Sequence, residues 1–164
     1  GFKVSSAEYE GFEYDKKKGG WKALNYLIES GVVAGKNEYF ERIHFDLGQM
    51  PLSDYRPPSE VTAVIRKAGG IPVLAHPLGT LAGAADPEGI LDRIVEAGVA
   101  GLECYSSYHT PEQTEFCLEY ALGKGLMITG GSDAHGGLTP ERRIGYPEVY
   151  LEDLVFNGNL KIQG

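Results

Sequence analysis

The first 57 positions of the chain are rich in charged and aromatic residues, and apolar residues recur at helical spacing in one stretch there. In WKALNYLIESGV (21–32) they recur every three or four residues, and a glycine follows where a helix would end. We expect a second short helix in NEYFERIHF (37–45). The paired prolines in DLGQMPLSDYRPPSE (46–60) predict an extended linker, because proline fits poorly inside a helix. The pattern predicts a mostly helical segment over residues 1–57, an insertion or a cap.

From residue 58 onward, short apolar runs alternate with helical patterns of ordinary length. The apolar runs are IPVLAH (71–76), VAGLECYS (99–106) and LMITGGSD (126–133), and PEVYL (147–151) is a candidate for a fourth. The helical patterns lie in PPSEVTAVIRKAGG (57–70), DPEGILDRIVEAGV (86–99) and TPEQTEFCLEYALGKG (110–125). The last of these opens with Thr110 as N-cap and carries Gln113 where a capping box requires it. Such alternation predicts at least three βα units around a parallel sheet, and so an α/β fold, in residues 58–164.

Polar side chains follow each of the three predicted strands at the point where it ends. They are His76 after the first strand, Glu103 and His109 after the second, and Asp133 and His135 after the third. The carboxyl ends of parallel strands meet at one edge of the sheet, where such folds carry their chemistry. Each residue alone also has a structural interpretation: a histidine can cap a strand, Asp133 can cap a turn, and Glu103 can pair with a lysine. Their gathering at one edge favours a joint site.

The stretch GGSDAHGG (130–137) carries the most specific pattern at this edge. Two residues apart in an extended segment, Asp133 and His135 project to the same side, where a carboxylate and an imidazole can bind zinc, manganese or iron. The flanking glycines allow backbone conformations that are closed to other residues. We therefore predict a metal-binding turn here, with His76 as its partner across the sheet.

Charge and composition narrow the classes of partner. Hydrophobic residues make up 42% and charged residues 23% of the 164 residues, which is a globular composition. The formal net charge of -8 argues against general nucleic-acid binding, although a bound cation would still permit a phosphorylated substrate. Cys104 and Cys117 indicate free thiols in a reducing compartment, and no apolar run approaches the roughly 20 residues of a membrane span. We expect a cytoplasmic protein that does not bind membranes.

Beyond these general patterns, IPVLAHP (71–77) and GLECYSSYHTPEQTEFCLEYALGKGLMITGGSDAHGG (101–137) resemble the later half of a PHP domain (polymerase and histidinol phosphatase). LTPERRIGYPEVYLEDL (138–154) resembles the tail of its bacterial metal-dependent phosphoesterases of the nucleotide-phosphatase type. The resemblance covers residues 58–155 well. It implies the C-terminal part of a distorted (β/α)7 TIM-like barrel, the PHP fold. It also implies two or three divalent metals (manganese, zinc or iron) and hydrolysis of phosphate esters, nucleotides among them.

The resemblance also assigns roles to residues of this chain. By match to the family motifs, His76, Asp133 and His135 are implied as metal ligands. Candidates for binding a small phosphorylated substrate are His109, Glu103, Arg142 and Arg143. An arginine suits this role because its planar fork matches pairs of phosphate oxygens. No residue is assigned as general acid or base.

The chain departs from the family pattern in its first half. Family members open with an HxH element and an SDH-like acidic element, and this chain has no HxH. His44 is its only histidine before His76, and we interpret it as a helix residue rather than a ligand. We therefore expect a C-terminal portion of a longer protein, inactive by itself and lacking further ligands. An incomplete barrel would leave two sheet edges unpaired, which favours a dimer.

Two other functions fit the same residues. The missing HxH element is consistent with a PHP-like module that has lost its metals and serves as a structural or interaction domain. A related barrel of the amidohydrolase type would also place an aspartate after a late strand, but the SDAHGG context favours a phosphoesterase. Metal analysis separates the first alternative, and a comparison of amide with phosphomonoester substrates separates the second.

Overall fold

The computed structural model describes residues 4–44 and 55–156 of the chain. Two compact units make up the chain, and each is described by itself. The helical unit comprises Gly1–Tyr55 and Ala134–Arg143, and the sheet unit comprises Arg56–Asp133 and Ile144–Gly164. The chain passes from the sheet unit to the helical unit directly after Asp133, inside the predicted metal-binding turn.

The sheet unit is built on three parallel strands in the order in which they occur along the chain. They are β1 (Val73–Leu74), β2 (Gly101–Ser106) and β3 (Met127–Gly131). Both pairs of neighbours are parallel, with β2 between the other two strands. The predicted α/β fold with a parallel sheet is confirmed, and the strands end at one edge, as the site prediction requires.

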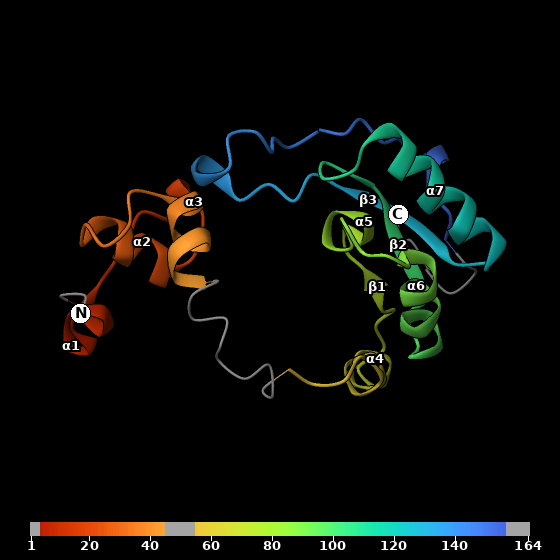
Figure 1. Cartoon of the computed structure of the whole chain (residues 1–164), viewed down its shortest axis with the longest axis horizontal. Helices are drawn as coiled ribbons and strands as arrows, with labels where there is room; N and C mark the ends of the chain where they lie inside the picture. Colours follow the sequence, from red (N-terminus) through yellow and green to blue (C-terminus); the bar gives the residue numbers. More distant parts are fainter. Residues whose placement is uncertain (1–3, 45–54, 157–164) are drawn as a thin grey trace. The chain divides into compact units, whose positions relative to one another are not determined.

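Among the described residues of the sheet unit, one helix precedes β1 and three lie between the strands along the chain. They are α4 (Pro58–Lys67), α5 (Pro77–Thr80), α6 (Pro87–Glu96) and α7 (Pro111–Gly123). Each begins with a proline, which suits the first turn because its backbone nitrogen has no hydrogen to leave unpaired. The capping box predicted for α7 is present: Thr110 Oγ1 accepts from the N–H of Gln113, and Gln113 Oε1 accepts from the N–H of Thr110. Figure 1 shows α5, α6 and α7 gathered around the strands.

One buried cluster joins these elements beneath the ends of the strands. Its fully buried members come from α6, β2 and α7: Leu91, Leu102, Cys104, Cys117 and Ala121. Each large apolar side chain of this kind stabilises the fold by about 1.5–3 kcal/mol when it is fully buried. The loops that follow β1, β2 and β3 therefore start from a well-packed base.

Two predicted strands differ in the structure. Only Val73–Leu74 of IPVLAH forms β1, because the chain turns into a left-handed conformation at His76 and Pro77 then begins α5. PEVYL is not a strand, and that prediction was wrong. The backbone pairing with β3 comes later, where Val155 and Ile128 form an isolated antiparallel bridge. Before it the chain makes the 3-10 turn η6 (Leu151–Asp153), in which the Asp153 carboxylate accepts from the Tyr150 N–H at 2.8 Å.

The described residues of the helical unit form short helical elements. They are α1 (Ser6–Gly11), η1 (Lys16–Lys18), α2 (Lys22–Glu29), α3 (Lys36–Glu38), η2 (Tyr39–His44) and η5 (Gly136–Leu138). The helix predicted in WKALNYLIESGV is α2, and the one in NEYFERIHF is α3 followed by the π-helical turn η2. Most of the predicted linker, residues 46–54, lies outside the described residues.

Residues 134–143 belong to the helical unit, although we predicted them as part of the segment 58–164. Within the described ranges, none of the helices is both long enough and apolar enough to span a membrane.

Candidate metal and phosphate site

His76 follows β1 in an uncommon backbone conformation. Its φ of 32° and ψ of 56° lie in the left-handed region, where the side chain crowds the backbone of any residue except glycine. The turn is held from two directions. The His76 N–H donates to Oε2 of Glu103 at 2.8 Å, and the imidazole Nδ1 lies 3.0 Å from Oγ1 of Thr80. The ring is thus oriented through Nδ1.

Asp133 follows β3 and shares this conformation. Its φ is 48°, and among residues 4–44 and 55–156 it and His76 are the non-glycine residues with positive φ. Conformations of this kind cost about 1–3 kcal/mol each and concentrate at functional sites, where the surrounding structure over-determines them. The two strained residues are the two metal ligands predicted in the sheet unit. This coincidence rests on backbone geometry and is independent of the sequence motifs.

Tyr108, in the loop after β2, connects these two residues. Its hydroxyl donates to Oδ2 of Asp133 at 2.9 Å, and its ring centroid lies 4.6 Å from that of His76. Tyr108 was not among the site residues predicted from the sequence. The available signal was its position in YSSYH, just beyond a predicted strand and beside a candidate histidine.

Glu103, inside β2, supports the turn at His76 rather than an ion pair. Its carboxylate accepts from the His76 N–H, and among the described residues no lysine pairs with it. The structural interpretation of Glu103 expected a lysine as its partner. In the structure its partner is a main-chain N–H. Gly131 makes room for this side chain, because a Cβ there would lie 2.5 Å from Oε1 of Glu103.

His109 is engaged through both ring nitrogens. Nδ1 lies 2.9 Å from the carbonyl oxygen of Cys104, and Nε2 accepts from the N–H of Leu78 at 3.2 Å. A carbonyl can only accept, so the proton is on Nδ1 and the ring is neutral. This arrangement joins β2 to the start of α5, and it differs from the phosphate contact that we predicted for His109.

The second half of the predicted metal-binding turn lies in the helical unit. The His135 N–H donates to Oγ1 of Thr139 at 3.1 Å, and its carbonyl accepts from the N–H of Gly20 at 3.2 Å. A Cβ on Gly19 would lie 1.6 Å from that carbonyl oxygen, and one on Gly136 would lie 3.0 Å from Cα of Gly19. Glycines of the GGSDAHGG turn therefore allow two backbone segments to touch, as well as a positive φ of 71° at Gly136.

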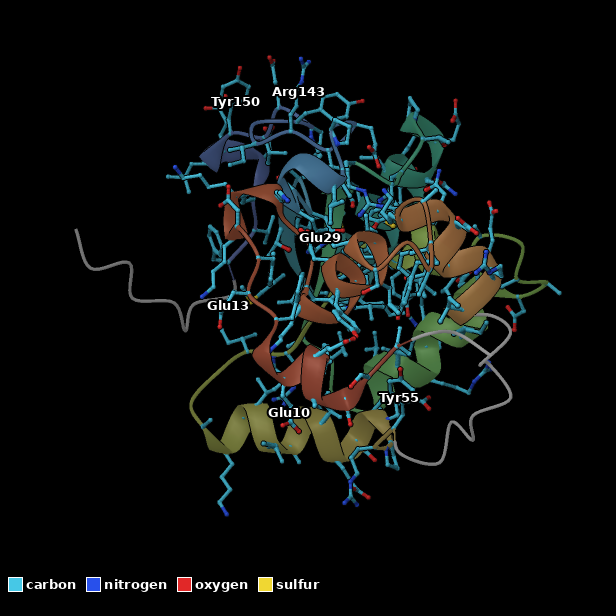
Figure 2. All side chains as sticks on the ribbon, turned by 90° about the vertical axis from the view of Figure 1, so that its left-hand side faces the viewer. Glu10, Glu13, Glu29, Tyr55, Arg143 and Tyr150 are labelled. Carbon is cyan, nitrogen blue, oxygen red and sulfur yellow. The ribbon has the colours of Figure 1, made fainter. Side chains whose placement is uncertain are left out.

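The two candidate arginines follow in the same unit. Arg142 is half-buried, and its N–H donates to the carbonyl of Thr139 at 2.8 Å. Arg143 is exposed, and its side chain projects away from the ribbon (Figure 2). The sheet unit thus brings together His76, Glu103 and Asp133, while His135, Arg142 and Arg143 belong to the helical unit.

The two cysteines are excluded as nucleophiles or thiolate ligands in this state. Both are buried in the core of the sheet unit, and burial raises the pKa of Cys104 to about 12 and that of Cys117 to about 11. A neutral thiol is a poor ligand and a poor nucleophile, because the thiolate does this chemistry.

A divalent metal fits the donors of the sheet unit in part. Imidazole and carboxylate are suitable ligands, and Thr80 at Nδ1 of His76 is the kind of outer partner that orients a ligating histidine. Across the part of the chain that the structure describes, however, no three His, Cys, Asp or Glu side chains are grouped to hold a metal. His76 and Asp133 can therefore contribute to a metal site but do not complete one.

Comparison with known proteins gives partial matches in sequence and in structure. A phosphoribosyl 1,2-cyclic phosphate 1,2-diphosphodiesterase of Eggerthella lenta is 34% identical over 93 residues, which are 57% of this chain and 34% of that protein. A solved structure from Bifidobacterium adolescentis, described as a metal-dependent phosphoesterase, matches with a TM-score of 0.60 and 25% identity. The chain resembles the PHP-type metal-dependent phosphoesterases.

The match to these PHP-type proteins is partial in length. It covers 88% of this chain but 52% of the Bifidobacterium protein, so the chain spans about half of that structure and about a third of the Eggerthella relative. An amidohydrolase from Chromobacterium violaceum, with bound sulfate and no metal, shares the fold at a TM-score of 0.54 and 24% identity, over 76% of this chain and 48% of that one. No family model matches the chain. The comparisons therefore show a partial likeness to these hydrolases in sequence and fold.

Proposed function

We propose that this chain supplies part of the active site of a PHP-type phosphoesterase that hydrolyses phosphate monoesters, nucleotides among them. The observation that carries the proposal is the pair His76 and Asp133. Both stand at the carboxyl edge of a parallel sheet in left-handed conformations, and Tyr108 links them. An imidazole and a carboxylate on residues with strained backbone conformations are expected of a functional site at this edge.

In this proposal His76, Asp133 and His135 hold divalent metal, with two or three ions of manganese, zinc or iron in the complete barrel. When bound, such ions neutralise the charge of the phosphate oxygens and lower the pKa of water so that it can attack phosphorus. Thr80 holds the imidazole of His76 by Nδ1 and leaves Nε2 for ligation. Glu103 holds the backbone of the same residue, which makes it a positioning group in the proposed site.

In this proposal the arginines bind the phosphate group of the substrate. Arg142 or Arg143 would engage the phosphate oxygens through a planar guanidinium, which remains charged at any pH of interest. The ring of His109 is engaged through both nitrogens, which supports a role in the fold, and a direct contact of His109 with phosphate is tested separately through its effect on KM.

The chain by itself is expected to be inactive. The donors that fit a metal are too few among the described residues, and the HxH element is lacking in the sequence. With manganese, we expect the 164-residue chain to hydrolyse p-nitrophenyl phosphate no faster than buffer does. Turnover at a rate typical of enzymes would overturn this part of the proposal.

The metal assignment is tested in the complete protein with a matched pair of substitutions. Asp133→Asn should lower kcat/KM for p-nitrophenyl phosphate by more than about 100-fold and reduce the bound metal, because it removes a charged ligand. Asp92→Asn is the control: Asp92 also accepts from a tyrosine hydroxyl, that of Tyr120 at 2.8 Å, but lies on α6. Equal activity and metal content in wild type and both variants would refute the assignment.

A metal-free structural or interaction module is the second candidate, and the lack of a three-donor group among the described residues favours it. It predicts that the complete protein, purified without chelators, contains less than about 0.1 divalent metal ion per chain. Elemental analysis of the purified protein separates the two functions.

A further inference from the structure

We infer that Tyr108 is a positioning residue that holds His76 and Asp133 together before metal binds. The inference rests on the proposed function, since it gives the pair a purpose as metal ligands. It adds a residue to which neither the sequence motifs nor the names of the similar proteins assign a role.

The first contact is made by the hydroxyl of Tyr108. It donates to Oδ2 of Asp133 at 2.9 Å, and the preceding residue, Ser107, donates from its hydroxyl to the carbonyl oxygen of Ser132 at 2.9 Å. Two consecutive residues of the loop after β2 thus hold two consecutive residues after β3. A hydrogen bond to one carboxylate oxygen fixes the orientation of the whole group.

The second contact is made by the ring of Tyr108. Its centroid lies 4.6 Å from that of the His76 imidazole, and the two planes are inclined at 40°. Gly79 in α5 makes this approach possible, because a Cβ at that position would lie 2.7 Å from Cβ of Tyr108. The imidazole is therefore held between Thr80 on one side, through Nδ1, and the aromatic ring on another.

The two contacts explain why both left-handed residues persist. His76 and Asp133 come from different loops, the first after β1 and the second after β3. Tyr108 contacts both through one rigid side chain with two rotatable torsions. Removing its hydroxyl should remove this hydrogen bond to the carboxylate while leaving the ring packed against the imidazole.

A matched pair of tyrosines makes this testable in the full 164-residue chain. Tyr108→Phe removes the bond to Asp133, and Tyr120→Phe removes an equivalent Tyr–Asp bond of 2.8 Å to Asp92, on the helices. The chain is labelled with 15N and titrated with manganese, which broadens the amide signals near its binding site. Tyr108→Phe should raise the manganese concentration that gives half broadening about tenfold, as loss of an outer partner of a ligand typically does.

The control variants distinguish a loss of metal binding from a loss of folding stability. Both phenylalanine variants should lower the Tm of the chain by similar amounts, since each loses one hydrogen bond of the same type, while Tyr120→Phe leaves the manganese titration within about twofold of wild type. Tyr108→Leu removes the ring as well and should weaken manganese binding further than Tyr108→Phe.

The variants also distinguish failure of the positioning role of Tyr108 from failure of the metal site. Asp133→Asn should abolish the broadening at Leu78 and Ser132. If it does so while Tyr108→Phe and Tyr120→Phe titrate alike, the positioning role is overturned and the metal site stands. If wild type shows no broadening at these amides, His76 and Asp133 do not bind manganese in this chain, and the positioning role of Tyr108 is overturned. The metal content of the complete protein then decides the proposed function separately.

Discussion

The imidazole of His109 accepts a hydrogen bond from the backbone N–H of Leu78, 31 residues earlier in the chain, at 3.2 Å. Its other nitrogen donates to the carbonyl of Cys104 at 2.9 Å. One side chain therefore satisfies a main-chain donor and a main-chain acceptor from two elements. Few residues other than a neutral histidine can do both at this distance.

We predict that His109→Ala lowers the free energy of unfolding by about 1–3 kcal/mol, because it removes a hydrogen-bond acceptor from Leu78 and a donor from Cys104, and both residues are buried. Urea denaturation of the 164-residue chain measures this loss. In the complete protein the KM for p-nitrophenyl phosphate should stay within about twofold of wild type. A large rise in KM with unchanged stability would instead restore the predicted phosphate contact.

The glycines of GGSDAHGG lead to a second prediction. Gly136→Ala should destabilise the chain by more than about 1 kcal/mol, because φ is 71° there and the new Cβ would lie 3.0 Å from Cα of Gly19. Gly123→Ala is the control, since a Cβ at that position meets nothing within 4 Å. Thermal unfolding of both variants compares them, and an equal Tm would contradict the close approach of the two segments.

Features that depend on neighbouring residues could be predicted from the sequence. The capping box of α7 needs only Thr110 and Gln113, and the alternation of strands and helices needs only local hydrophobic spacing. PEVYL shows the limit, because an apolar run does not reveal whether a neighbouring strand will accept it. The pairing occurs instead at Val155, where β3 offers a free backbone edge at Ile128.

The parts of the site that escaped prediction depend on packing between distant segments. Tyr108 acts through two loops that come together only in the folded sheet. In the same way, the sequence identifies His109 as a histidine beyond a strand but cannot show that Leu78 needs an acceptor there. The candidate ligands His76 and Asp133 were found because their positions at strand ends are a local property.

The buried thiols permit a third prediction. Cys104 and Cys117 should not react with Ellman's reagent in the native chain, because both are buried and burial raises their pKa values to about 12 and 11. In denaturing urea both should react within seconds to minutes. The rate of absorbance change in the two conditions measures this, and rapid native reaction of either thiol would contradict the packing of the core.

The last prediction concerns acid stability and the ion pair on the helices. Lys124 lies 2.7 Å from Oδ1 of Asp92, and hydrogen bonds from Lys124 and then Tyr120 lower the pKa of this carboxyl below its ordinary value. A carboxyl whose pKa is lower in the folded state stabilises the fold above its unfolded pKa of about 3.9, and this contribution is lost as the pH falls through the folded value.

Asp92→Asn should therefore have a lower Tm than wild type near pH 6–7, and the difference should shrink as the pH falls below about 4. Thermal unfolding of both proteins between pH 2 and 7 measures it. Lys124→Met should reduce the same difference, since it removes the leading cause of the lowered pKa. A Tm difference that is constant over the whole range would show that the carboxylate charge of Asp92 contributes nothing to stability.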